Sequence, residues 1–244
     1  MKNRSDQLVH EFGRKIVTGE YRSGEVLPKV EYISEINEVS RTVVREAFRG
    51  LSTLGLVRSN QKAGTVVLPC SDWQWWNLDV LTWIIEDGNN TDFLLHLTEV
   101  RLGLEPIAAS LAAKRATEQD LINIKNAFER LEQSIGDEKA WAKADYDFHE
   151  RILQASYNAI MINTIKTLRK ALVLSREKTY HAAMNFPRSL YDSMYESPTQ
   201  EVLERHRSIY DAIMARDEDL ARQNMSDLIL RVKKLLEQIN EKHS

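Results

Sequence analysis

From Asp92 onward, apolar residues recur with the 3.6-residue period of an α-helix, and this pattern limits the fold more than any other feature of the chain. No strand signal follows Leu68, and the one long irregular stretch, 184–198, contains Pro187 and Pro198. The period predicts helices at about 92–114, 117–135, 137–155, 158–184, 197–215 and 217–241. A run of helices without strands predicts an all-α helical bundle for this part of the chain.

The first 70 residues follow a different pattern, in which three short helices precede two β-rich stretches. We expect helices at 8–17, 30–37 and 41–54, with the last one capped by Ser40 and ended by Gly55. Strands at 56–58 and 65–68 would form a hairpin. The expected fold is therefore mostly α, with a winged helix-turn-helix at 1–70, a Trp-rich linker at 71–91 and an all-helical domain at 92–244.

The linker holds four of the five tryptophans of the chain within eleven residues, from Trp73 to Trp83. Aromatic side chains bury a large area at a low cost in conformational entropy. We therefore interpret these tryptophans as inter-domain or dimer packing rather than as a surface on which bases stack.

Charge and cysteine content narrow the class of protein. Residues 1–70 carry 11 basic and 8 acidic residues, whereas the remainder carries 22 and 28, so a basic head is joined to an acidic body. A basic head favours a nucleic-acid partner. The single cysteine, Cys70, excludes an internal disulfide, and no apolar run reaches the roughly 20 residues that span a bilayer. We expect a cytoplasmic protein without membrane segments.

The helix that begins after Ser40 has two distinct faces. Its apolar residues share one arc, and its polar residues Arg41, Thr42, Arg45 and Arg49 share the opposite arc. A short helix, a tight turn and a helix with such an outward face form a helix-turn-helix, in which arginine binds phosphates or guanine edges. On periodicity alone, an ordinary surface helix with solvated arginines explains the pattern equally well.

The motifs of this head resemble those of GntR-type regulators. The resemblance rests on the segment 39–48 (VSRTVVREAF), on Leu54-Gly55-Leu56, on Leu27-Pro28 before the second helix, and on 64–67 (GTVV) in the wing. It implies that Arg41 and Arg45 contact DNA. One departure is Glu31, which stands near a point where the family commonly has a basic contact. The candidate DNA-binding residues are Arg41, Thr42, Arg45, Arg49, Lys62 and Gly64.

Three helices of the C-terminal part place charged or imidazole groups where the period demands apolar ones. Arg101 lies on one apolar stripe, His206 lies on another, and Asp145 and His149 share a helix face at i,i+4 spacing. Because a buried charge is costly unless it is paired or coordinated, these groups predict one shared polar pocket. Asp145, His149 and His206 form a plausible metal set, and Arg101 would face an anionic ligand. Satisfied core polar residues remain the alternative.

The same helices resemble the ligand-binding (FCD) domain of the fatty-acid-regulator branch of GntR proteins. The matching motifs are Glu99-Val100-Arg101 with 104–109 (LEPIAA), Asp145-x-x-Phe148-His149, and Arg205-His206-Arg207. The resemblance implies metal ligands at Asp145, His149 and His206, and imidazole and carboxylate ligands suit zinc, nickel or manganese. The usual fourth ligand, a His three residues after Met225, is replaced here by Leu228.

The segment 76–83 (WNLDVLTW) further resembles the sugar-acid repressors of the galactonate type. The resemblance implies a ligand-responsive, homodimeric repressor that binds double-stranded operator DNA and takes an aldonate such as galactonate as its effector. It implies no enzymatic activity. Three alternatives remain open at this point: a metal-dependent enzyme that uses Asp145, His149 and His206, a family member that responds to another carboxylate, and one that responds to metal or to a protein.

Overall fold

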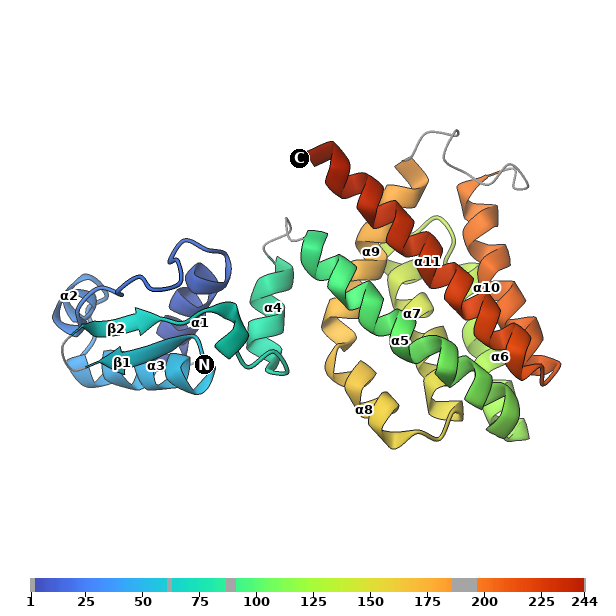
Figure 1. Ribbon diagram of the computed structural model, residues 1–244, viewed down its shortest axis with the longest axis horizontal. Helices are drawn as coiled ribbons and strands as arrows, with labels where there is room; N and C mark the ends of the chain where they lie inside the picture. Colours follow the sequence, from blue (N-terminus) through green and yellow to red (C-terminus); the bar gives the residue numbers. More distant parts are fainter. Residues whose placement is uncertain (1–2, 61–62, 87–90, 186–196, 244) are drawn as a thin grey trace. The chain divides into compact units, whose positions relative to one another are not determined.

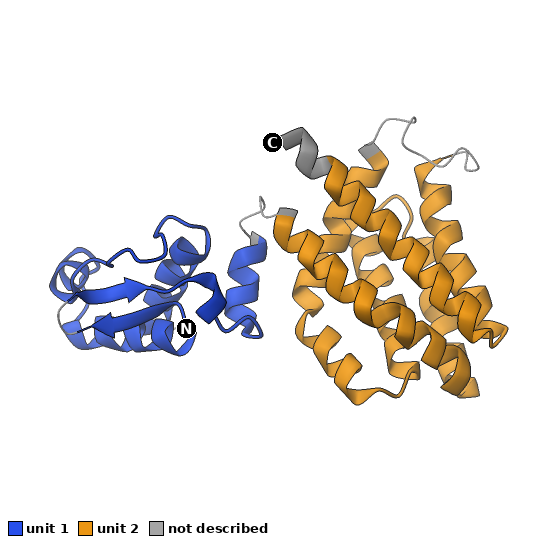
Figure 2. Cartoon of the chain, viewed as in Figure 1, with its two compact units in different colours: residues 1–90 blue, residues 91–244 orange. Residues whose placement is uncertain are grey.

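A computed structural model describes the chain except residues 1–2, 61–62, 87–90, 186–196 and 244 (Figure 1). The chain divides into two compact units, unit 1 at Met1–Asn90 and unit 2 at Thr91–Ser244 (Figure 2). The described part of unit 1 contains four helices, a 3-10 turn and one hairpin. These are α1 (Arg4–Val17), α2 (Val30–Ile36), α3 (Arg41–Thr53), β1 (Val57–Asn60), β2 (Gly64–Val67), η1 (Cys70–Asp72) and α4 (Leu78–Glu86).

Helix α3 forms where the capping residues predict it. The Ser40 side chain accepts a hydrogen bond from the backbone N–H of Val43, and the chain turns at Gly55, whose φ is +72°. A Cβ at Gly55 would lie 2.1 Å from the carbonyl oxygen of Asp72, so no larger residue fits this turn. The buried face of α3 consists of Val44, Ala47, Phe48 and Leu51.

The antiparallel hairpin β1–β2 completes a winged helix-turn-helix. Val57 pairs with Val67 and Asn60 pairs with Gly64, so the hairpin tip lies between residues 60 and 64. Val26 adds a single bridge to Val66, which ties the segment before α2 to the wing. The mostly helical fold and the winged head predicted from the sequence are therefore confirmed.

The stretch 71–91, which the sequence analysis treated as a linker, contains α4. Trp83 on α4 is 1% exposed and packs on α1, where a Cβ at Gly13 would lie 2.4 Å from the indole ring. The edge of the His10 ring also faces Trp83, at 5.7 Å between centroids. Trp83 was expected to serve inter-domain or dimer packing, but it is a core residue of unit 1. In contrast, Trp76 is 61% exposed.

Unit 2 is a bundle of seven helices among the described residues. These are α5 (Thr91–Arg115), α6 (Glu118–Gln133), α7 (Glu138–Ala155), α8 (Ala159–Thr167), α9 (Arg169–Asn185), α10 (Pro198–Met214) and α11 (Glu218–His243). Helix α7 packs against α5, α6 and α9, and α11 packs along α5 and α10 (Figure 1). Helix α6 begins with a capping box formed by Thr117 and Asp120.

One helix prediction was wrong. The single helix expected at 158–184 is divided at Leu168 into α8 and α9. No glycine or proline marks the break, and the apolar period continues across it, so the sequence predicted one helix instead of two. Ile165, Leu168 and Leu172 are all buried, so the change of direction lets apolar residues on both sides of the break face the bundle. Packing, and not a local breaker residue, therefore accounts for the break.

Among the described residues, no helix combines the length and the apolar character that a bilayer crossing requires.

Candidate DNA-binding surface and effector site

The predicted outward face of α3 is exposed. Arg41, Thr42, Arg45 and Arg49 all lie at the surface, and the apolar residues behind them are buried except Val43, which is half-buried. An arginine row on an exposed helix, next to a wing, is the arrangement with which winged helix-turn-helix proteins reach a DNA groove and its phosphates.

The second helix modifies this surface. The Arg41 guanidinium lies 3.7 Å from the Glu31 carboxylate on α2, and both side chains are more than half exposed. Glu31 is the residue at which the sequence departs from the family pattern, and its contact with Arg41 places a negative charge on the candidate DNA-binding face. In the wing, Gly64 is exposed and has a φ of +89°, whereas Lys62 lies outside the described residues.

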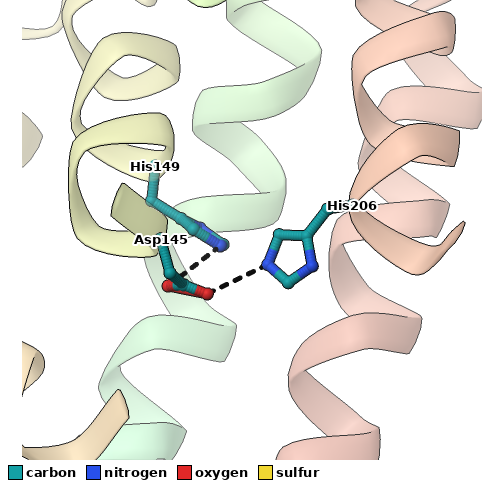
Figure 3. A group of neighbouring side chains, drawn as sticks. All are labelled: Asp145, His149 and His206. Atoms are coloured by element: carbon teal, nitrogen blue, oxygen red, sulfur yellow. Dashed lines mark hydrogen bonds and ion pairs between the residues drawn. The ribbon is translucent and has the colours of Figure 1, made fainter. Parts of the chain in front are cut away.

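In unit 2 the four predicted site residues meet inside the bundle. Arg101 comes from α5, Asp145 and His149 come from α7, and His206 comes from α10; none is more than 6% exposed. Asp145, His149 and His206 point toward one another, and one ligand atom from each lies within 4.8 Å of the others (Figure 3). The predicted convergence of these side chains is therefore present in the fold.

Two further charged residues complete the cluster, and neither was predicted from the sequence. Glu105 on α5 is 1% exposed, and Arg176 on α9 is 4% exposed. Glu105 lies one helical turn after Arg101, so the i,i+4 rule was a signal that could have identified it. Arg176 is brought to the site by the packing of α9 on α7, and no motif marked it.

These residues form a connected network of ion pairs. Glu105 accepts hydrogen bonds from Nε of Arg101 at 2.8 Å and from Nη2 of Arg101 at 3.3 Å. Its Oε2 also lies 2.6 Å from Nδ1 of His149. Asp145 accepts a hydrogen bond from Nε of Arg176 through Oδ1, and its Oδ2 lies 3.0 Å from Nε2 of His206. Arg101, expected to face an anionic ligand, is thus paired within its own helix.

The pKa shifts follow from burial and from these pairs. Burial alone would raise the pKa of Glu105, but Arg101, His149 and Arg176 outweigh it and hold the pKa well below the usual range. The pKa of Asp145 is lowered in the same way, mainly by Arg176. Burial lowers the pKa of His149 despite the opposing effect of Glu105 and Asp145, which favours a neutral imidazole. The cluster therefore holds two carboxylates and a neutral imidazole, the protonation states that metal coordination requires.

A cavity of about 660 Å³, including its open mouth, lies beside the network. Arg101, Asp145, Arg176 and His206 contribute its charged inner wall. Its remaining walls consist of Trp141, Thr179, Tyr180, Ala183, Pro198, Glu201, Val202, Arg205, Leu228, Arg231, Val232 and Leu235. Buried charged residues of the network therefore line part of this cavity. Leu228, at the position of the usual fourth metal ligand, also lines this cavity, but its side chain has no atom that can bind a metal.

The donor set fits a divalent metal ion. Nδ1 of His206 lies 2.7 Å from the carbonyl oxygen of Val202, and Nδ1 of His149 faces Glu105. A carbonyl or carboxylate on Nδ1 orients the ring and leaves Nε2 to bind a metal. Nε2 of His149 has no hydrogen-bond partner among the described residues, and Nε2 of both rings faces Asp145. Asp145, His149 and His206 would therefore hold the ion with three side chains, and further positions would be left for effector or water.

Comparison with known proteins gives the family. The model of the bacterial regulatory proteins of the gntR family matches residues 4–67, and the FCD domain model matches residues 96–231. The galactonate operon transcriptional repressor of Escherichia coli K12 is 30% identical over 240 residues, covering 97% of this chain and 98% of the relative. This chain belongs to the GntR family and carries an FCD domain.

Further relatives support the same assignment. The Uxu operon transcriptional regulator of Escherichia coli K12 is 29% identical, covering 91% of this chain and 82% of the relative. The structure of a GntR protein from Streptococcus agalactiae has a TM-score of 0.50 at 25% identity, covering 94% of this chain and 99% of the other. The families and relatives identify a transcriptional regulator, so the alternative of a metal-dependent enzyme is excluded.

Proposed function

We propose that this GntR regulator represses a sugar-acid catabolic operon and leaves its operator when an aldonate such as galactonate binds to unit 2. The observation that carries the proposal is the buried Arg/Asp/His network that lines part of the cavity in unit 2. The identity of 30% with a relative that is a galactonate operon repressor supports the effector class. Operator DNA lies in the bacterial cytoplasm, so the proposal places the protein there.

The DNA side of the proposal uses the exposed face of α3 and the wing. Arg45 and Arg49 would bind phosphates or base edges in the major groove, and Arg41 and Thr42 would contact the groove near the start of the helix. Lys62 and Gly64 would contact the backbone from the wing. Two copies of the chain would bind the two halves of a pseudo-palindromic operator as a homodimer, because half-site spacing reflects a two-fold axis.

The effector side uses the inner wall of the cavity. Arg101 would contribute positive charge for the carboxylate of the aldonate, while Asp145, His149 and His206 would hold zinc, nickel or manganese. When bound, the ion supplies a Lewis-acidic point that binds carboxylate and hydroxyl oxygens of the effector. Glu105 and Val202 keep the two imidazoles in the orientation that this requires.

Effector binding must favour a conformation with lower DNA affinity if it is to release the operator. The ligand-binding residues lie on α5, α7 and α10, so a ligand that contacts all three changes the packing of these helices against one another. A regulator of the same family that responds to another carboxylate would use the same network.

A thermal-shift screen of the full chain against sugar acids, with and without added Ni²⁺, tests the proposal. We expect one aldonate to raise the melting temperature through preferential binding to the folded state, and Arg101→Ala to abolish the rise. The same aldonate should release a labelled operator fragment. Binding of an aldonate without operator release would overturn the regulatory part, and the absence of any shift with sugar acids would overturn the effector assignment.

A further inference from the structure

Arg176 takes a position in the cluster that neither the sequence motifs nor the proposed metal set accounts for. Its Nε donates to Oδ1 of Asp145, its Nη2 lies 3.8 Å from Oε1 of Glu105, and its guanidinium lies 5.7 Å from the centre of the Tyr146 ring. Its Nη1 is buried and has no hydrogen-bond partner among the described residues. A buried guanidinium N–H without a partner is costly, so this nitrogen is available for an anion.

Arg176 also bonds to one of the two oxygen atoms through which Asp145 would bind a metal. Oδ1 of Asp145 is bonded to Arg176, and Oδ2 is bonded to His206, so both carboxylate oxygens are engaged. Burial and the nearby charge of Arg101 lower the pKa of Arg176, with Asp145 and Glu105 opposing the shift. The two carboxylates therefore stabilise the charged form of this guanidinium.

Among the arginines and carboxylates of the cluster, positive and negative charges are equal in number without a metal. Arg101 and Arg176 supply two positive charges, and Glu105 and Asp145 supply two negative ones, all at least nine-tenths buried. A divalent cation would add two positive charges to this balanced set, and uncompensated buried charge is strongly unfavourable. An anionic effector that binds at the same time would offset part of that charge.

We infer that Arg176 and a divalent cation compete for Asp145, and that the guanidinium released by the cation binds the carboxylate of the effector. Arg176 is thus a stand-in cation in the metal-free protein and an anion-binding residue in the metal-bound protein. Metal and effector then bind with positive coupling, which by thermodynamic reciprocity is the same in both directions. The effector part of this inference rests on the proposed function, whereas the competition for Asp145 does not.

The competition is tested by Ni²⁺ titration of the full chain with calorimetry. Arg176→Met should bind Ni²⁺ at least about tenfold more tightly than the unaltered protein, because a repelling charge is removed and Asp145 is released. Arg176→Lys keeps the charge and should stay near the unaltered affinity. Arg169→Met is the matched control, since Arg169 is an exposed arginine of the same helix that also lies over the Tyr146 ring.

Several outcomes would overturn the competition. A purely structural role predicts that Arg176→Met weakens Ni²⁺ binding, because Asp145 loses the partner that orients it. Equal affinity in Arg176→Met and Arg169→Met would also overturn it, as would the absence of Ni²⁺ binding to any of the proteins. If Arg176→Met unfolds without metal, a larger Ni²⁺-induced rise in its melting temperature than in Arg176→Lys would still support the competition.

The coupling is tested by titrating galactonate into the same proteins with and without Ni²⁺. In the unaltered chain Ni²⁺ should tighten galactonate binding at least about fivefold, the lower end of typical coupling between sites. In Arg176→Met this enhancement should be smaller while Ni²⁺ still binds, because the ion still contacts the effector but the released guanidinium is missing. An undiminished enhancement in the variant overturns the role of Arg176. If galactonate binds none of the proteins, the aldonate assignment and the coupling are both wrong. The competition for Asp145 is then tested by the Ni²⁺ titration alone.

Discussion

Arginine is used in opposite ways in the two units of this protein. In unit 1, Arg41, Arg45 and Arg49 stand exposed along α3. In unit 2, Arg101 and Arg176 are at least 96% buried and are held by Glu105 and Asp145. The exposed arginines remain hydrated, whereas the buried ones have exchanged water for carboxylates.

The difference determines how each group responds to change. An exposed charge acts over long distances, is screened by salt and contributes little to folding. A buried, paired charge is screened little, and the removal of its partner leaves a charge that nothing solvates. The affinity for the operator should therefore fall gradually with added salt and with each arginine removed. In contrast, the loss of a single charged residue from the buried network should destabilise the whole effector site.

The largest expected effect is that of Glu105→Ala. The substitution removes the carboxylate shared by Arg101, His149 and Arg176, and should lower the unfolding free energy of unit 2 by about 3–5 kcal/mol. Urea unfolding followed by far-UV circular dichroism measures it. The matched control is Glu99→Ala on the same helix, whose carboxylate pairs with Lys233 at the surface and should matter little. Equal effects of the two changes would remove the distinction between buried and exposed pairs.

The second-largest effect should be that of acidification, which lowers the unfolding free energy of unit 2. The folded pKa of His149 is below its unfolded value of 6.5, so below about pH 6.5 the unfolded chain binds a proton that the folded chain does not. The depressed pKa values of Glu105 and Asp145, relative to 4.5 and 3.8, act in the same direction at lower pH. The unfolding free energy should fall continuously from pH 7 to pH 4. Glu105→Gln should show a shallower decline, and an identical slope would contradict this origin.

Arg45→Ala should weaken operator binding by about 1–3 kcal/mol and leave stability nearly unchanged. Fluorescence anisotropy with a labelled operator at several salt concentrations measures both the affinity and its salt dependence. If Arg45 contacts a phosphate, the slope of log affinity against log salt should decrease in magnitude by about one. Lys15→Ala on α1, which removes the same charge, is the control and should change the affinity much less. A loss of the same size in both variants would show that only net charge matters.

The smallest expected effect is that of Glu31→Gln. The substitution removes the negative charge 3.7 Å from Arg41 and should tighten operator binding by less than about fivefold. The gain should shrink as salt increases, because both side chains are exposed. In the background of Arg41→Ala the gain should disappear. Weaker binding of Glu31→Gln would instead indicate that Glu31 itself contacts the operator.

Much of this architecture could be predicted from local pattern. Ser40, Gly55 and the apolar positions of α3 predicted that helix and its outward arginines, because caps and the 3.6-residue period are encoded within a few residues. The same period placed Arg101, Asp145, His149 and His206 on inward faces. The break at Leu168 was missed, since neither glycine nor proline marks it. Helix α4 was missed although Asn77, which caps its start, and Gly88, which follows its end, were local signals.

The sequence by itself determined which helix face each residue occupies, because side-chain direction along a helix depends only on the backbone period. Tertiary packing determined the partners. Arg176 meets Asp145 only because α9 packs on α7, and His149 meets Glu105 only because α7 packs on α5. These contacts join positions 31 and 44 residues apart, and no local rule specifies them. Burial then makes each pair obligatory, since a lone charge in the bundle would have no water to solvate it.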